Sequence, residues 1–493
     1  MKIQFPTEQI IARMKFENPW WLSGSIEQYY SNMKRREYYK MLFPLVQETE
    51  IKRAVVLMGP RRVGKTVLLF QTIQGLIDVK VPPGNICYFS VETPIYNGVS
   101  LDELLGYFFQ IQGVKNNSGL FIFFDEIQYL KNWEIHLKSL VDSYHNIKFI
   151  VSGSAAAALK LKSTESGAGR FTDFVLPPLT FYEYLSLKGI NTLIIDKTYG
   201  KNINGEQYAI NDYEYTDIKE LNRHFVDYIN FGGYPEVSLS QSIQSDAGRY
   251  IRNDIIDKVL LRDLPVLYGI EDIQELNSLF NYITYNTGNE MSLESISQSS
   301  GVSKNTIKKY ITYLEAAFLI KVVHRIDNNG KKFKRANFFK VYLTNPSLRS
   351  ALFSPIQEDD PFMGNMVETA IYSQWQHAEY PLYYARWNNG EVDIVYLNAA
   401  NQKPEWVVEI KWSNNPTTDY KELKNIRQFC NIHHMQNCTI TTYDKKIRII
   451  NENIEFYFTP ASLYCYTVGR NLITDKKWPG LHFINTINSI PHE

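Results

Sequence analysis

The sequence predicts an α/β protein built on a parallel sheet, and three observations support this prediction. First, short apolar runs alternate with helical patterns over about residues 53–190, which is typical of βαβ units. Second, the motif G-x-x-x-x-G-K-T directly follows the first apolar run, at 53–58. Third, the apolar run that begins at Leu120 ends in two acidic residues. Both motifs are therefore expected at the carboxyl edge of one sheet, where open α/β sheets bind ligands.

Five apolar runs are expected to form the strands of this sheet. They cover about residues 53–58, 86–92, 120–125, 148–152 and 173–176. Right-handed crossovers between successive strands make such a sheet parallel. The polar and aromatic residues before it, up to about 50, are expected to end in an amphipathic helix that leads into the first strand.

The glycine-rich motif is expected to bind the phosphates of ATP. Its residues are Gly59, Pro60, Arg61, Arg62, Val63, Gly64, Lys65 and Thr66, and Val67 opens the following helix. Backbone N–H groups of such a loop close around the phosphates, Lys65 reaches the β- and γ-phosphates, and the Thr66 hydroxyl can ligate Mg²⁺. The helix over about 67–76 points its N-terminus at the same anion. A glycine-rich turn without a ligand is the alternative, and the acidic strand end disfavours it.

The acids at the end of the third strand are expected to complete this site. Asp125 would hold Mg²⁺ through water, and Glu126 would orient and deprotonate the water that attacks the γ-phosphate. The fourth strand ends in hydroxyls, and Ser152 or Ser154 would contact the γ-phosphate. The alternative for these serines is a plain strand end.

Composition limits the kinds of partner. The 493 residues contain 52 Lys plus Arg and 52 Asp plus Glu, so the net charge is zero and no global field attracts nucleic acid or a membrane. Four cysteines without paired spacing suit a reducing compartment. No apolar run is long enough to cross a bilayer, and the first residues lack a hydrophobic signal core. A cytoplasmic protein without a membrane partner is expected.

The middle of the chain, about 205–345, reads as mostly helical and contains a helix-turn-helix pattern. A short helix from Ser292, a turn at Gly301 and a second helix capped by Ser303 make up this pattern. Apolar runs at 320–323 and 338–342 then indicate a hairpin wing. Basic residues on the second helix and the wing could follow DNA phosphates: Lys304, Lys308, Lys309, Lys331, Lys332, Lys334 and Arg335. The alternative is a winged helix that serves only as a lid or packing module.

At this point the chain resembles prokaryotic AAA+ superfamily ATPases that carry a C-terminal nuclease-like domain of unknown function. The matching segments are 59–66, 124–128, 152–154, 169–170, 177–184, 232–236 and 262–263. The resemblance implies an AAA+ sheet with the phosphate-loop strand central, binding of ATP and ADP with Mg²⁺, and hydrolysis of ATP. Assembly into a homo-oligomer is a further expectation.

Arg170 is a candidate for stabilising the charge on the transferring phosphoryl group, in its own or in a neighbouring subunit. A structural arginine paired with a surface carboxylate is the alternative. Arg61 and Arg62 in the loop are rival candidates for the same role.

The C-terminal part resembles the PD-(D/E)XK restriction-endonuclease core. A helix with Glu368 precedes strands at 382–386, 391–397 and 406–411, a helix at about 420–430 and a strand at 438–442. The resemblance implies that Asp393 and Glu409 hold Mg²⁺ and that Lys411 positions the nucleophile, while Glu368 could complete the acidic pocket. Residues 409 and 411 share one face of a strand. Val392 stands where the family usually has proline.

The expected organisation is therefore an α/β AAA+ phosphate-loop domain, a helical and winged-helix domain, and an α/β restriction-endonuclease-like domain. The expected boundaries are 1–50 for an N-terminal helical segment, then 51–200, 201–350 and 361–470 for the three domains, and 471–493 for a tail. Two functions remain open. One is an ATPase that controls a metal-dependent nuclease acting on nucleic acid; the other is a nucleotide switch with a catalytically silent interaction domain.

Overall fold

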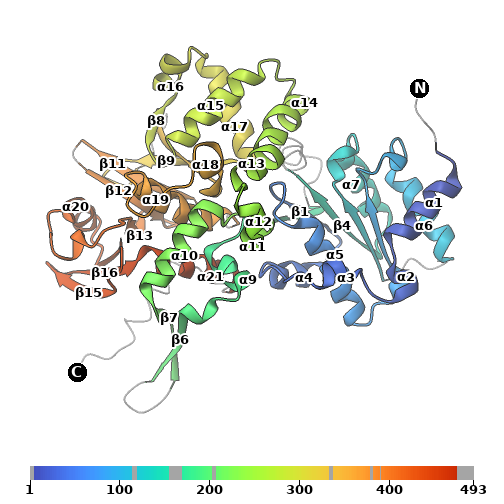
Figure 1. Ribbon diagram of the computed structural model, residues 1–493, viewed down its shortest axis with the longest axis horizontal. Coiled ribbons are helices and arrows are strands. Elements are labelled where there is room, and N and C mark those ends of the chain that lie inside the picture. Colours follow the sequence, from blue (N-terminus) through green and yellow to red (C-terminus); the bar gives the residue numbers. More distant parts are fainter. Residues whose placement is uncertain are drawn as a thin grey trace. The chain divides into compact units, whose positions relative to one another are not determined.

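The computed structural model describes residues 5–113, 119–154, 169–201, 207–331, 337–377, 381–388 and 390–474. The chain divides into two compact units (Figure 1). The first consists of Met1–Pro177 with Val266–Gly269, and the second of Pro178–Pro265 with Ile270–Glu493.

The first unit is built on a five-stranded parallel sheet in the order β2-β3-β4-β1-β5. Its strands are β1 (Ala54–Met58), β2 (Ile86–Ser90), β3 (Leu120–Asp125), β4 (Ile147–Gly153) and β5 (Phe171–Val175). Its helices are α1 (Thr7–Glu17), α2 (Trp20–Ser23), α3 (Gln28–Ser31), α4 (Tyr39–Gln47), α5 (Lys65–Asp78), α6 (Leu101–Gln112) and α7 (Trp133–Ser143), with the 3-10 turns η1 (Pro83–Asn85), η2 (Pro94–Tyr96) and η3 (Ile127–Tyr129). The α/β class and all five predicted strands are confirmed.

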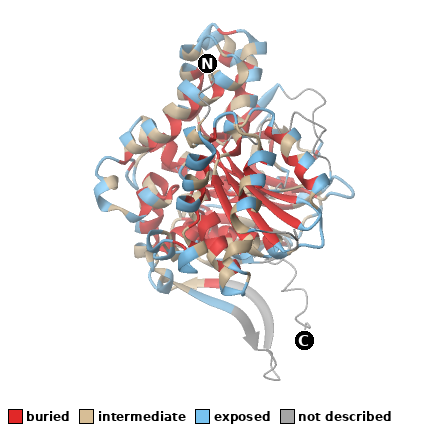
Figure 2. Ribbon diagram, turned by 90° about the vertical axis from the view of Figure 1, so that its right-hand side faces the viewer, coloured by how far each residue is buried: buried red, intermediate tan, exposed pale blue. Residues whose placement is uncertain are grey.

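The inner strands are buried along their whole length, which explains their continuous apolar sequences. Figure 2 shows these buried strands among helices whose outer faces are exposed. The phosphate-loop strand β1 is an inner strand, but β4 occupies the centre, so the expected central position of β1 is wrong by one strand. Three strands lie on one side of β1 and only β5 lies on the other, so β1 is the second strand from that edge of the sheet.

The second unit contains a nine-stranded mixed sheet in the order β15-β16-β14-β13-β12-β11-β9-β10-β8, and a separate hairpin of β6 and β7. Its strands are β6 (Ile194–Lys201), β7 (Gln207–Tyr215), β8 (Glu290–Ser292), β9 (Ile320–Ile326), β10 (Phe338–Leu343), β11 (Leu382–Trp387), β12 (Gly390–Leu397), β13 (Pro404–Glu409), β14 (Asn437–Thr442), β15 (Ile447–Asn451) and β16 (Ile454–Pro460). The α-helices from residue 178 onward are α9 (Phe181–Lys188), α10 (Ile218–Phe231), α11 (Pro235–Leu239), α12 (Gln241–Gln244), α13 (Ala247–Ile251), α14 (Leu264–Tyr268), α15 (Ile273–Tyr285), α16 (Leu293–Ser300), α17 (Lys304–Ala316), α18 (Ser347–Leu352), α19 (Met363–Ser373), α20 (Lys424–Ile432) and α21 (Ala461–Thr474). Two π-helical segments, η6 (Arg252–Asp257) and η7 (Val259–Asp263), and 3-10 turns at Asn191–Leu193, Gln374–Gln376 and Asn415–Thr417 complete the description.

The predicted helix-turn-helix elements and hairpin are present in this unit. Helix α16 ends at Gly301, which has a φ of 73°, and the Ser303 side chain accepts a hydrogen bond from the Thr306 N–H at the start of α17. Strands β9 and β10 form an antiparallel hairpin. Strand β9 also pairs with β11, so one sheet runs from the hairpin into the C-terminal strands.

The expected domain boundaries stay predictions, although several observations bear on where they would be drawn. Helix α1 lies against β2 and the Asn18 side chain hydrogen bonds to the Tyr88 backbone, so the N-terminal helices belong to the first unit. The first unit ends at Pro177, ahead of position 200, and helix α21 reaches Thr474, so the expected tail begins within a helix.

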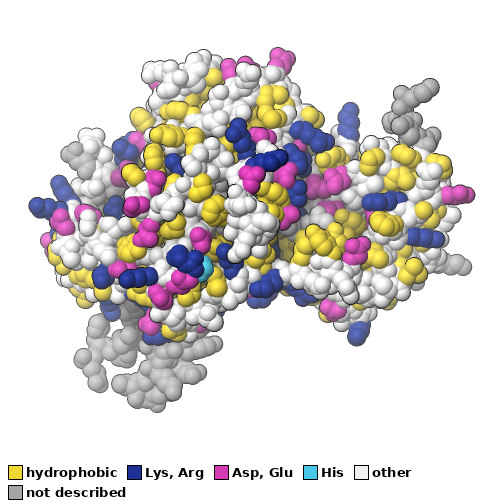
Figure 3. Space-filling view, in the orientation of Figure 1, with side chains coloured by type: hydrophobic (Ala, Val, Ile, Leu, Met, Phe, Trp, Pro, Cys, Tyr) yellow, Lys and Arg dark blue, Asp and Glu magenta, His cyan; other side chains and the backbone are white. Residues whose placement is uncertain are grey.

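No helix in the described ranges combines the length and the apolar character that a membrane span requires. On the face shown in Figure 3, Lys and Arg side chains are interspersed with Asp and Glu, in keeping with the zero net charge.

Candidate nucleotide-binding site and acidic pocket

The glycine-rich loop lies between β1 and α5, as the sequence predicts. The buried Lys65 ammonium donates hydrogen bonds to the carbonyl oxygens of Gly59 (3.1 Å) and Pro60 (2.9 Å), so it already points into the loop. A Cβ atom on Gly59 would lie 2.2 Å from the Leu176 carbonyl oxygen. This position therefore requires glycine.

Thr66 and Asp125 are brought together by the strand order. The Thr66 hydroxyl donates a 2.7 Å hydrogen bond to Asp125 Oδ2, and the Tyr88 hydroxyl donates one of 2.8 Å to the same oxygen. Ser152 donates to Asp125 Oδ1. Burial raises the pKa of Asp125, and the neighbouring Glu126 raises it further, while the three hydroxyl donors oppose the shift. An oxygen cluster of this kind is poised for a cation.

Glu126 begins the turn after β3 in a left-handed conformation, with a φ of 55°. Such a conformation is strained in a residue other than glycine and is often found at functional sites. The Glu126 N–H donates to Ser152 Oγ at 3.2 Å, and Gln128 Nε2 donates to the Glu126 carboxylate. Gln128 Oε1 in turn accepts from the Ser154 N–H at 3.2 Å, and the Ser154 hydroxyl is buried without a hydrogen-bond partner. Glu126 is thus held in place by the end of β4.

Mg²⁺ fits the first unit on these observations. The Thr66 and Asp125 oxygens are adjacent, and hard oxygen ligands combined with water are what this ion prefers. Thr66 and Asp125 are therefore the residues that would hold it.

Arg170 is not brought to this site within the chain. It lies at the start of β5, where its backbone carbonyl accepts from the Ala54 N–H, at the amino edge of the sheet. The phosphate loop follows Met58, about 13 Å further along β1 at the usual rise per residue. Arg170 pairs with Asp142 at 3.1 Å on the surface, as the structural alternative anticipates. Of its rivals, Arg61 is half-buried and Arg62 is exposed, and both lie in the loop itself.

The four residues expected to form the nuclease-like site come from neighbouring elements of the second unit. Glu368 lies on α19, Asp393 on β12, and Glu409 ends β13. The Lys411 ammonium donates to Glu409 Oε1 at 2.7 Å, and Asp393 Oδ2 accepts from the Ile410 N–H at 2.8 Å. The fold therefore brings these charged side chains together in one buried group, which we call the acidic pocket.

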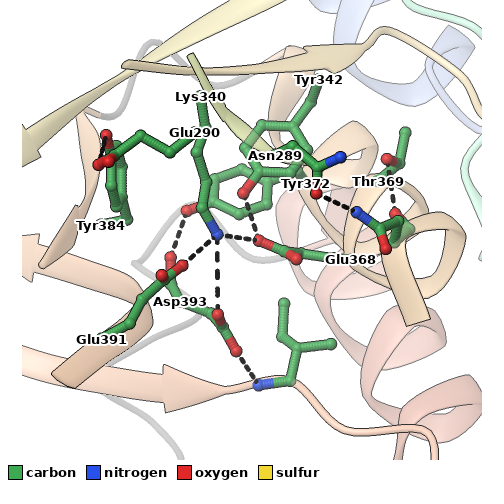
Figure 4. A network of polar contacts seen from close by, with 12 residues as sticks. Asn289, Glu290, Lys340, Tyr342, Glu368, Thr369, Tyr372, Tyr384, Glu391 and Asp393 are labelled. Carbon is green, nitrogen blue, oxygen red and sulfur yellow. Dashed lines mark hydrogen bonds and ion pairs between the residues drawn. The ribbon is translucent and has the colours of Figure 1, made fainter. Parts of the chain in front are cut away.

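The acidic pocket also contains Lys340, a residue that sequence reasoning missed. Its buried ammonium lies 2.9 Å from Glu368 Oε1, 2.6 Å from Glu391 Oε1 and 3.8 Å from Asp393 Oδ1 (Figure 4). The Tyr342 hydroxyl also donates to Glu368. In the described ranges, no three carboxylate, imidazole or thiol side chains are grouped to hold one metal ion. The Lys340 ammonium thus lies among carboxylates that the resemblance assigns to a metal site, and the assignment of Glu368, Asp393 and Glu409 to such a site stays a prediction.

The electrostatics of the acidic pocket reflect this burial. Burial raises the pKa of Glu368 to about 7, although the Lys340 ammonium lowers it. Burial and then Asp393 raise the pKa of Glu409 to about 8, against the opposing effect of Lys411. Burial acts to lower the pKa of Lys340, but the surrounding carboxylates raise it well above its usual value. Burial thus opposes ionisation throughout the pocket, and the charged neighbours decide the direction of each shift.

Sequence reasoning missed three residues that contact these sites, namely Tyr88, Gln128 and Lys340. Tyr88 and Lys340 appear in the sequence as ordinary strand residues, and only the strand order places them beside acids. Lys340 did offer a hint, because it is a lysine within the apolar run 338–343, where a buried charge needs a partner. Gln128 follows the acidic strand end directly and could have been considered for that reason.

Comparison with known families agrees with the phosphate-loop unit. Residues 51–185 match the family described as "AAA domain". Residues 222–359 match a domain of unknown function, DUF8612. The nuclease-like part has no support from these matches.

Relatives and solved structures are distant. The uncharacterized protein MJ1544 of Methanocaldococcus jannaschii is 26% identical over 379 residues, covering 75% of this chain and 77% of the relative. An uncharacterized protein of Haemophilus influenzae is 24% identical over 388 residues, which cover 76% of this chain and 88% of the relative. The Aeropyrum pernix Orc1 protein in complex with DNA aligns with a TM-score of 0.31 and 12% identity, over 70% of this chain and 97% of that one. A mutant of Thermotoga maritima RuvB aligns with a TM-score of 0.28 and 18% identity, over 58% of this chain and 89% of that one. The match to the family model is what identifies residues 51–185 as a domain of the AAA type.

Proposed function

We propose that the first unit binds ATP with Mg²⁺ and hydrolyses it. The observation that carries this proposal is the 2.7 Å hydrogen bond from Thr66 to Asp125, which joins the phosphate loop to the acidic strand end. Lys65 and Glu126 flank this pair, one on each motif. The phosphate-binding lysine, the cation-binding hydroxyl and carboxylate, and the acid that would orient water are thus all present at one edge of the sheet, and an arginine that stabilises the transferring phosphoryl group would have to come from elsewhere.

Each side chain has a definite task in this proposal. Backbone N–H groups of the loop and the Lys65 ammonium bind the phosphates. Mg²⁺, when bound, neutralises charge on the phosphate oxygens. Glu126 orients the attacking water and takes its proton, and Ser152 fixes Asp125 and the Glu126 backbone. Release of Glu126 from Gln128 would free the carboxylate for this step.

Steady-state turnover tests the proposal. Glu126→Gln should slow hydrolysis severalfold or more while ATP still binds, and Lys65→Ala should remove tight nucleotide binding. Gln74→Ala in α5 serves as a control that should leave turnover unchanged, because this side chain bonds to Asp78 and to the Ile26 N–H and not to the phosphate loop. Unchanged turnover in both site variants would refute the assignment.

We further propose that α16, α17 and the β9–β10 hairpin form a winged helix that contacts DNA without reading its sequence. Lys308, Lys309 and Lys331 are exposed, whereas Lys304 pairs with Glu294. Lys332, Lys334 and Arg335 lie outside the described residues. A packing module is the alternative. Fluorescence anisotropy with labelled duplex DNA distinguishes the two, because phosphate contacts weaken with salt and Lys308→Ala with Lys309→Ala should weaken binding for every sequence.

For the C-terminal part, nucleotide-controlled cleavage of nucleic acid is a second candidate function. The convergence of Glu368, Asp393, Glu409 and Lys411 in one pocket favours it. The Lys340 ammonium among these carboxylates favours the other reading, a silent interaction domain. Incubation with Mg²⁺ and assorted DNA and RNA, with and without ATP, separates them. Cleavage that Asp393→Ala abolishes, with ATP hydrolysis intact, would establish the nuclease.

A further inference from the structure

The acidic pocket places a lysine where a divalent cation would be expected. The three carboxylates around the Lys340 ammonium come from α19 and β12, the same elements that supply Glu368 and Asp393 to the candidate metal set. Figure 4 shows the ammonium in the middle of these carboxylates. The centre of the Tyr384 ring lies 5.4 Å from the same nitrogen, at a distance typical of a cation–π contact.

A second observation points to a cation at this place. Glu409 Oε2 is buried and has no hydrogen-bond partner, although Oε1 of the same carboxyl accepts from Lys411. A buried carboxylate oxygen normally has a partner. The two lysines of the pocket thus leave one buried carboxyl oxygen without a hydrogen-bond donor.

We propose that the Lys340 ammonium replaces the divalent cation of this pocket, so that the wild-type chain binds no metal ion there and a variant without this charge does. A small dication and an ammonium compete for the same oxygens and repel each other strongly in a buried setting.

The fold keeps Lys340 in place. It lies within β10, which pairs with β9 on one side and with β8 on the other, so the backbone of this residue is fixed from both sides. The side chain is only 4% exposed. The lysine is therefore held within the pocket, and the inference is independent of ATP hydrolysis, whereas metal-dependent cleavage at this pocket would contradict it.

Binding of Mn²⁺ to nucleotide-free protein, followed by electron paramagnetic resonance, tests the proposal. The wild type and Asp393→Asn should bind the same number of Mn²⁺ ions. Lys340→Gln keeps a hydrogen-bonding side chain without the charge. This variant should gain one Mn²⁺ site, with an affinity at least roughly tenfold higher than that of the same pocket in the wild type, because the loss of one nearby unit charge removes a repulsion larger than a tenfold change in affinity represents. Adding Asp393→Asn to Lys340→Gln should remove this site again.

Two results would overturn the proposal. One is a Mn²⁺ site in the wild type that Asp393→Asn removes, a comparison that does not depend on the folding of any Lys340 variant. The other is a Lys340→Gln protein that is folded by circular dichroism and gains no site. Lys340→Arg, which retains the charge, should behave like the wild type.

Discussion

Thr66 and Asp125 are joined by a 2.7 Å hydrogen bond although β4 separates the strands that precede them. The bond links the phosphate loop after β1 to the acidic end of β3. Asp125 also accepts from Tyr88 within β2 and from Ser152 near the end of β4, so a single carboxylate connects three strands and the first turn of α5. The site is therefore a property of the whole sheet edge.

Tyr88 is the first residue for which this arrangement makes a prediction. Tyr88→Phe removes one donor to the Asp125 carboxylate, and a hydrogen bond to a charged group is worth roughly 1.5–3 kcal/mol. We expect turnover at saturating ATP to fall about tenfold or more. Tyr96→Phe is a matched control, because it removes a buried tyrosine hydrogen bond to Glu17 away from the site. Equal losses in both variants would mean that Tyr88 acts only on stability.

Gly59 gives a second prediction. An added Cβ would collide with the Leu176 carbonyl oxygen at 2.2 Å, so Gly59→Ala must displace the phosphate loop. We expect ATP affinity, measured by titration calorimetry, to fall strongly. Gly106→Ala in α6 is the control: its Cβ would meet no atom within 4 Å, and alanine favours a helix. Normal affinity in Gly59→Ala would show that the loop tolerates the shift.

Arg170 gives a third prediction, which concerns assembly. Since the chain itself does not bring this arginine to the phosphate loop, a catalytic role requires a neighbouring subunit. We expect ATP to promote oligomers in light scattering, and specific turnover to rise with protein concentration in the wild type but not in Arg170→Ala. Asp142→Asn, which removes only the surface partner, should keep the concentration dependence. A monomer with full specific activity at every concentration would leave Arg170 as a structural residue.

The acidic pocket predicts a pH dependence of local stability. Glu409 has a pKa of about 8 in the folded chain, raised by burial, and an ordinary value of 4.5 when unfolded. Between these two values the folded state keeps a proton that the unfolded state has lost. The contribution of Glu409 to the free energy of unfolding therefore decreases as the pH rises from about 5 through 8. Hydrogen exchange of β12 and β13, corrected for the intrinsic rate, should show less protection at pH 8.5 than at pH 6. Glu409→Gln should weaken this dependence; an unchanged dependence would contradict the assignment.

The sequence could predict the parts of this chain that depend on local pattern. The five strands of the first unit, the phosphate loop and the acids after β3 follow from apolar runs and motif spacing, and the structure contains them. The grouping of Glu368, Asp393, Glu409 and Lys411 was also suggested by their order in the sequence, whereas their role as a metal site stays a prediction. What the pattern could not supply is the pairing between distant strands. The proximity of Lys340 to Asp393 depends on β9 joining β11, a long-range contact that no local signal encodes.

The same limit explains Arg170. Its position after the fourth strand suggested a site near the γ-phosphate, but it begins the next strand at the opposite edge of the sheet. Residues that start a parallel strand and residues that end one are separated by the strand length.

Equilibrium binding of ATP in the presence of Mg²⁺ tests the central claim most directly. Titration calorimetry on the Glu126→Gln protein, which should retain ATP, is expected to give one site per chain, and the same titration on Lys65→Ala should show no tight binding. Omission of Mg²⁺ from the titration should weaken ATP binding by Glu126→Gln, because Thr66 and Asp125 are the residues that would hold the ion. Absence of ATP binding in Glu126→Gln, or equal binding by both variants, would contradict the account.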